Sequence, residues 1–207
     1  SNLLDDGQFD RCLISLSPGG SDADTTREFC LKTSTFVEGG FEMLEPAKSQ
    51  VGWRSRDEVL VGTDFDGDGE CLTDSGYPRV CRSWKRGTPL SEAKTVFEGE
   101  KSDISASQYA YTDHGVAHEF RVRSLTFYTA KYWHRTPSDL DKVSAADDDT
   151  PFAEVPIQED AQVSTFGSMA LITLRSDWTV SGRTFKQGSL LSCKFSDLMA
   201  SDLTKAQ

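Results

Sequence analysis

Residues 50–98 read QVGWRSRDEVLVGTDFDGDGECLTDSGYPRVCRSWKRGTPLSEAKTVFE, and this stretch decides the fold. It holds four short runs that favour β-strands, at residues 50–53, 59–63, 79–84 and 94–98. Gly, Asp, Ser and Pro separate the runs, and these residues favour turns. Four antiparallel strands in a repeat of roughly 40 to 60 residues are typical of a propeller blade.

Similar units lie on both sides of this stretch. The strongest β-runs start roughly 50 residues apart, and a second short run precedes most of them. The strong runs are Cys12–Leu16, Glu58–Gly62, Phe120–Leu125 and Met169–Leu174. The preceding runs are Gln50–Trp53, Asp103–Ala106 and Ala161–Ser164. Helical periodicity is confined to Pro89–Ala93 and Asp197–Ala200, each a turn or two long.

We therefore predict an all-β fold, a partial β-propeller over residues 1–207. Its expected blades are residues 1–47, 48–101, 102–159 and 160–207: about four four-stranded antiparallel blades of an incomplete ring that would hold seven. A β-sandwich is the alternative, but it gives no reason for four-strand units to repeat. The third unit carries an extra segment, residues 136–149, which we predict to be a solvated loop on one rim.

Charge and hydropathy exclude several classes of partner. The formal net charge is −11, whereas nucleic-acid binding requires clustered Lys and Arg, so we expect no nucleic-acid partner. The apolar runs are too short to span a membrane. The basic residues Arg82, Lys85 and Arg86 are expected on a solvated strand face. The first residues contain no targeting signal, which leaves cytoplasmic and periplasmic locations open, and we expect the chain to be a fragment.

Metal and disulfide signals are weak. Five cysteines, at 12, 30, 71, 81 and 193, form no C-x-x-C pair and are expected as small buried hydrophobic residues, with one disulfide left open. Asp64-x-Asp66-x-Asp68-Gly69 matches the first half of a calcium loop, but Ser75 occupies the position of the closing Glu, so an acidic turn is favoured over a calcium site.

The sequence also predicts no catalytic, cofactor-binding or metal-binding residues. A nucleophile elbow requires G-x-S-x-G, and the nearest matches, Gly20-Ser21-Asp22 and Ser75-Gly76, are typical of turns. His114 and His118 lack the Glu of a zinc-peptidase helix. For His134, an outward strand position or a satisfied polar contact is expected.

Several motifs together resemble bacterial members of the prolyl oligopeptidase family. They are Leu16–Ala23 with Arg27-Glu28-Phe29, Phe36–Phe41, Val59–Phe65, Leu72–Arg79, Trp84–Leu90, Leu125–Tyr128 and Leu174–Val180. The resemblance covers nearly the whole chain. It departs from the family pattern at Cys30, where an acidic residue is usual, and at the turn of residues 64–71.

This resemblance implies a role that composition alone does not give. In the family, a propeller caps an α/β-hydrolase domain that holds the serine, Asp and His of the catalytic triad, and only propeller sequence is found here. The resemblance thus implies a parent serine peptidase cleaving after proline, with the propeller gating access of short peptide substrates to its hydrolase-domain partner. The alternative is a free-standing propeller that binds proteins or peptides without catalysis.

Overall fold

The computed structural model describes residues 2–204 and 206, and β-strands account for most of its regular structure. One short α-helix, α1 (Phe195–Met199), and two 3₁₀ turns, at Pro18–Gly20 and Leu90–Glu92, complete the described elements. All paired strands are antiparallel and nearly all neighbours in a sheet are neighbours in sequence. The all-β prediction is therefore confirmed.

The first sheet contains β1 (Asn2–Leu3), β2 (Arg11–Leu16), β3 (Asp24–Cys30), β4 (Thr35–Phe36) and β5 (Glu42–Ala47). It has five strands rather than the predicted four, because two separate segments pair with β3. The chain bends between them at Gly39 and Gly40, where a Cβ on Gly40 would lie 2.9 Å from the Glu28 carboxylate. Glu28 accepts hydrogen bonds there from the Phe41 and Val37 amides, through its side chain and its carbonyl respectively.

The second sheet matches the predicted four-strand unit. It contains β6 (Gln50–Ser55), β7 (Glu58–Gly62), β8 (Val80–Lys85) and β9 (Lys94–Glu98), in that order. Every residue of β7 is buried, as its continuous apolar run predicts for a strand covered on both faces.

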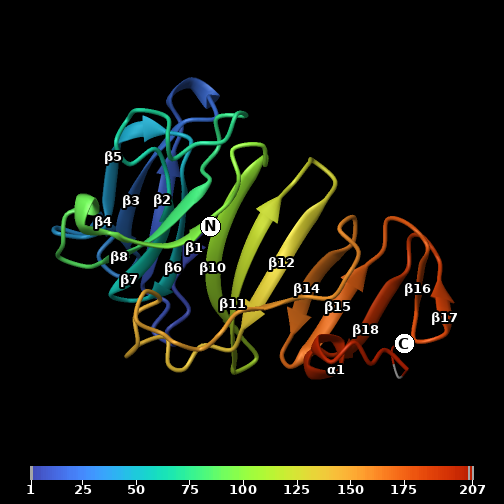
Figure 1. The fold of residues 1–207 in the computed structure, drawn as a ribbon. Coiled ribbons are helices and arrows are strands. Elements are labelled where there is room, and N and C mark those ends of the chain that lie inside the picture. Colours follow the sequence, from blue (N-terminus) through green and yellow to red (C-terminus); the bar gives the residue numbers. More distant parts are fainter. Residues whose placement is uncertain (1, 205, 207) are drawn as a thin grey trace.

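The third sheet contains β10 (Ser105–Asp113), β11 (Val116–Ser124), β12 (Ala130–Arg135) and β13 (Ala153–Glu154). Residues 136–149, between β12 and β13, run beneath the second sheet, and we call them the strap (Figure 1). The prediction of a solvated loop holds for only part of the segment: Lys142 and Asp147 are exposed, but Ser144, Ala145 and Asp148 are buried. Their burial depends on polar contacts to a different sheet, described below.

The fourth sheet has three strands, β14 (Gln162–Phe166), β15 (Met169–Thr173) and β18 (Leu190–Lys194). The strands β16 (Trp178–Val180) and β17 (Arg183–Phe185) form a separate hairpin, so four-stranded pairing is wrong for this unit also. Ser181 and Gly182 both have positive φ, 50° and 74°, which suits the tight turn between twisted strands. That turn pairs β17 with β16 instead of with the main sheet.

The four sheets follow one another side by side in chain order, like successive sectors of a fan (Figure 1). A cluster of fourteen buried residues forms the core of the fourth unit and reaches the third through Phe120 and Val155, and a cluster centred on Phe41, Trp53 and Trp84 joins the first sheet to the second. The cluster between the second and third sheets is the smallest of the three, with Leu60, Cys81 and Ala145 as its buried residues.

Candidate functional site at the interface of the second and third sheets

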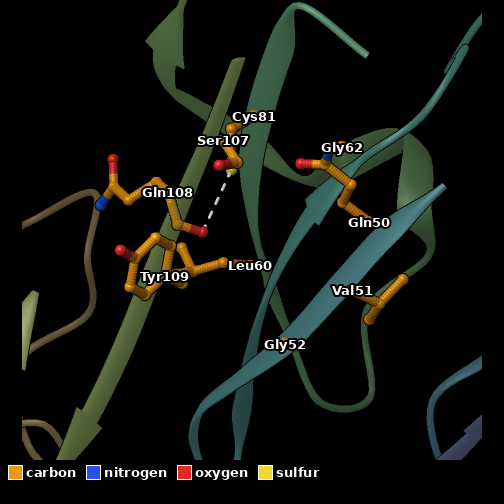
Figure 2. Close-up of a pocket in the computed structure, with 9 residues that line it drawn as sticks. All are labelled: Gln50, Val51, Gly52, Leu60, Gly62, Cys81, Ser107, Gln108 and Tyr109. Carbon is orange, nitrogen blue, oxygen red and sulfur yellow. Dashed lines mark hydrogen bonds between the residues drawn. The ribbon is translucent and has the colours of Figure 1, made fainter. Parts of the chain in front are cut away.

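A cleft opens at the middle interface, between strands β6, β7 and β8 of the second sheet and β10 of the third (Figure 2). Its volume is about 220 Å³, and its lining residues are Gln50, Val51, Gly52, Leu60, Gly62, Cys81, Ser107, Gln108 and Tyr109. Gly52 helps to keep it open. A Cβ added at Gly52 would meet nothing within 4 Å.

The polar groups of the cleft are uncharged. Gln50 Oε1 is buried without a hydrogen-bond partner, and its amide group points across the gap toward Ser107 and Cys81 (Figure 2). Cys81 Sγ lies 3.9 Å from the carbonyl oxygen of Gln108. Burial raises the pKa of Cys81 to about 12, so this thiol is protonated at neutral pH and is a poor nucleophile.

Beside the cleft, five charged residues form a buried network that we call the clamp: Arg54, Glu58, Glu119, Arg135 and Asp148. Their side chains are at most 6% exposed. Arg54 of β6 donates to Glu58 (3.1 Å), to Glu119 of β11 (3.3 Å) and to Asp148 of the strap (3.4 Å). Arg135 of β12 donates through Nε to Glu119 at 2.9 Å. One network thus connects two sheets and the strap.

The strap is attached to the second sheet through the same carboxylates. Glu58 accepts hydrogen bonds from Ser144 Oγ (2.8 Å) and from the Ala145 amide (2.9 Å), and also from Ser83. Arg54 donates to the carbonyl oxygen of Val143. Ser144, Ala145 and Asp148, buried residues of the strap, have small or polar side chains and are held mainly by these polar contacts.

Asp148 remains ionised within this buried network. Burial alone would raise its pKa, but hydrogen bonds from Thr150 and Ser138 and the charge of Arg135 lower the pKa to about 2. Two guanidinium groups face three carboxylates in the clamp, and each charge has several hydrogen-bond partners. Such a network fixes geometry, whereas the loss of one member leaves an uncompensated buried charge.

The structure separates the histidines that were considered as a pair. His114 lies on the β10–β11 turn, where its Nδ1 is 2.6 Å from Asp113 Oδ1. His118 is buried, and its Nε2 donates to the carbonyl oxygen of Gly167 (2.9 Å). His118 Nδ1 lies 3.0 Å from His134 Nε2, so the expected satisfied polar contact is the correct alternative for His134.

The acidic segment 64–69 forms a turn held by its own carboxylates. Asp64 Oδ2 accepts from the Gly69 amide (3.0 Å), and Asp68 Oδ1 accepts from the Glu70 amide (3.0 Å). No group of three or more His, Cys, Asp or Glu side chains suited to a metal ion occurs among residues 2–204 and 206. All five cysteines are free thiols, and four of them are buried.

The serines of the two nearest nucleophile-elbow matches, Ser21 and Ser75, both lie in turns. Ser21 Oγ donates to the Ala23 carbonyl within a local turn (3.0 Å), and the Gly76 amide donates to the Thr73 carbonyl (2.8 Å), which places Ser75 in a turn. No helix of the described chain has the length and apolar character needed to cross a membrane.

The expectation of a solvated basic face is wrong for two of its three residues. Arg86 forms a two-pronged ion pair with the buried Glu28 carboxylate, at 2.8 and 3.1 Å. Arg82 stacks over the ring of Phe65, 4.0 Å from its centroid. Lys85 is half exposed and pairs with Asp147 of the strap.

Sequence reasoning missed the clamp altogether. Arg54, Glu58 and Glu119 are charged residues within strand-forming runs, and the alternation of a strand normally places such residues toward solvent. A weak signal was present at Glu58, which directly precedes the fully apolar run Val59-Leu60-Val61.

Comparisons with known proteins all find peptidases. The chain is 32% identical over 185 residues to an uncharacterized peptidase of Sinorhizobium fredii, and 28% identical over 204 residues to another from Rickettsia prowazekii. Among solved structures, it is similar to a post-proline cleaving enzyme from Rickettsia typhi, with a TM-score of 0.81 and 26% identity over 96% of this chain. These matches confirm the resemblance to propeller-domain sequence of the prolyl oligopeptidase family.

The similarity is to the propeller domain of such peptidases. Oligopeptidase B from Leishmania major shares the fold, with a TM-score of 0.58 at 13% identity. The chain spans about a quarter of the length of the relatives that it matches: 24% and 27% of the two peptidases, and 29% of the Rickettsia typhi enzyme. The matched region is therefore part of a larger peptidase chain in each case. No family model matches the sequence.

Proposed function

We propose that this chain is the propeller segment of a serine peptidase and filters access of short peptides to a hydrolase domain that cleaves after proline. The four units, residues 1–47, 48–101, 102–159 and 160–207, act as four blades of a larger ring. The catalytic serine, Asp and His belong to the hydrolase domain, and the residues of this chain contribute geometry rather than chemistry.

One observation carries the proposal. The similarity to the post-proline cleaving enzyme extends over 96% of this chain and includes both fold and sequence. A shared loop or a shared β-architecture alone would not give similarity over four successive sheets.

The middle interface supports the filtering role physically. A filter must keep its aperture narrow, so neighbouring blades must resist separation. The interface with the smallest apolar cluster is the one that also contains the clamp and the strap. Arg54 on β6 and Glu119 on β11 join the two sheets, so the blades cannot separate without breaking their hydrogen bond.

The test uses the full-length polypeptide that contains these residues. Proline-linked chromogenic peptides of increasing length are incubated with the protein, and kcat/KM is measured for each. The proposal predicts cleavage after proline with a sharp fall in kcat/KM as peptides lengthen. Absence of cleavage, together with peptide or protein binding, would instead indicate a free-standing interaction module. Cleavage of long and short peptides at equal kcat/KM would contradict the filter.

A further inference from the structure

The cleft between the second and third sheets adjoins the clamp through Gln108, which lines the cleft and donates from Nε2 to Glu119 at 2.7 Å. None of the five clamp residues lines the cleft itself. The cleft has a volume of about 220 Å³. It is smaller than most sites for drug-sized ligands, so it suits one short molecular segment.

The lining excludes charged ligands. All nine lining residues are uncharged, although the chain has a formal net charge of −11. An ion that entered the cleft would lose hydration without gaining a partner of opposite charge. The occupant is therefore an uncharged group.

The polar atoms of the cleft specify the hydrogen bonds of that occupant. Gln50 Oε1 is a buried acceptor without a partner, so it requires an N–H or O–H donor. The Ser107 hydroxyl, which also lines the cleft, can donate to a carbonyl oxygen. A secondary amide offers one N–H and one C=O, as this pair requires. Leu60 and the ring of Tyr109 supply apolar walls on which a small side chain can pack.

We propose that this cleft binds an uncharged peptide segment, whose backbone N–H donates to Gln50 Oε1 and whose carbonyl oxygen accepts from Ser107. The proposal rests on the proposed function, because it makes a peptide in transit toward the hydrolase domain the natural ligand. Gly52 leaves space for the segment, because a Cβ there would meet nothing within 4 Å.

The experiment measures binding on the 207-residue chain without any catalysis. N-acetylalanine methylamide is titrated into ¹⁵N-labelled protein, and amide chemical shifts are followed. We expect saturable shifts at Gly52, Gly62, Ser107 and Gln108. N-acetylglycine, which carries a carboxylate, should shift these amides much less.

Variants decide whether Gln50 recognises the probe. Gln50→Leu should weaken binding about two- to tenfold, as loss of one neutral hydrogen bond does. Gly52→Val should abolish binding by filling the cleft. Gln158→Leu is the matched control, because Gln158 Oε1 is also buried without a partner but lies outside the cleft, and its binding should be unchanged. If Gln50→Leu does not fold, Ser107→Ala replaces it.

Two results would overturn the proposal: shifts located outside the cleft, or unchanged affinity in the Gln50→Leu and Ser107→Ala variants. Failure here leaves the proposed function intact, because that function is judged by cleavage in the full-length protein. Conversely, loss of cleavage in that assay would not remove binding measured on this chain.

Discussion

Neutralising the Glu119 carboxylate is a direct test of the clamp. Glu119 is completely buried. It accepts from Arg54 Nε (3.3 Å), from Arg135 Nε (2.9 Å) and from Gln108 Nε2 (2.7 Å). Glu119→Gln keeps the shape of the side chain but removes the charge that neutralises two buried guanidinium groups.

The expected loss in the free energy of unfolding is about 3–5 kcal/mol, the range measured when one partner of a buried ion pair is removed. Urea unfolding at neutral pH, followed by far-ultraviolet circular dichroism, gives the free energy from the midpoint and slope. The wild-type spectrum should be dominated by β-structure. The matched control is Lys142→Met, which removes an exposed ion pair with Asp139 and should leave the unfolding midpoint unchanged. A loss below about 1 kcal/mol for Glu119→Gln would refute the reasoning.

Three further predictions follow from the structure. Burial and the charge of His118 lower the pKa of His134 to about 4, whereas its pKa in the unfolded chain is about 6.5. The neutral ring therefore stabilises the fold fully above pH 6.5, and this stabilisation is lost as the pH falls toward 4. The urea midpoint should fall as the pH is lowered from 6.5 to 4. An equal fall in a His134→Gln variant would contradict the assignment to His134. Millimolar calcium should leave the melting temperature unchanged, because Asp64 Oδ2 already accepts from the Gly69 amide and Ser75 supplies no closing carboxylate; a rise that Asp66→Ala abolishes would disprove this. The 207-residue chain alone should not hydrolyse a proline-linked chromogenic peptide, and turnover that survives removal of contaminating peptidases would reveal a catalytic group among these residues.

The strands were predictable from sequence where burial follows local pattern. The run Val59-Leu60-Val61 and its turn-flanked neighbours gave the four-strand order of the second sheet, because apolar continuity and turn residues are local properties. Two features were not predictable in this way: the pairing of β3 with two separate segments, β4 and β5, and the separate β16–β17 hairpin. Both depend on the direction that a turn gives the chain, and the sequence of the preceding strand does not show that direction.

The candidate site was hidden for a different reason. Ala145 donates to Glu58 across 87 positions of sequence, and Arg54 reaches Glu119 across 65. No local pattern marks such pairs, so charged side chains and the polar strap were assigned to solvent. The cleft likewise depends on the juxtaposition of β6 and β10, which appears only once two sheets are placed side by side.

The central claim is that a rigid propeller limits the length of peptide that reaches a neighbouring hydrolase site, and one measurement tests it most directly. In the full-length protein, the ratio of kcat/KM for a long to a short proline-linked peptide is compared between wild type, Glu58→Gln and Lys142→Met. Glu58 attaches the strap to the second sheet, so its neutralisation loosens the middle interface. We predict that Glu58→Gln raises the ratio while cleavage of the short peptide is retained, and that Lys142→Met leaves the ratio unchanged. If the urea midpoint of Glu58→Gln is lower than that of the wild type, which shows that the clamp is weakened, an unchanged ratio in this variant would contradict the claim.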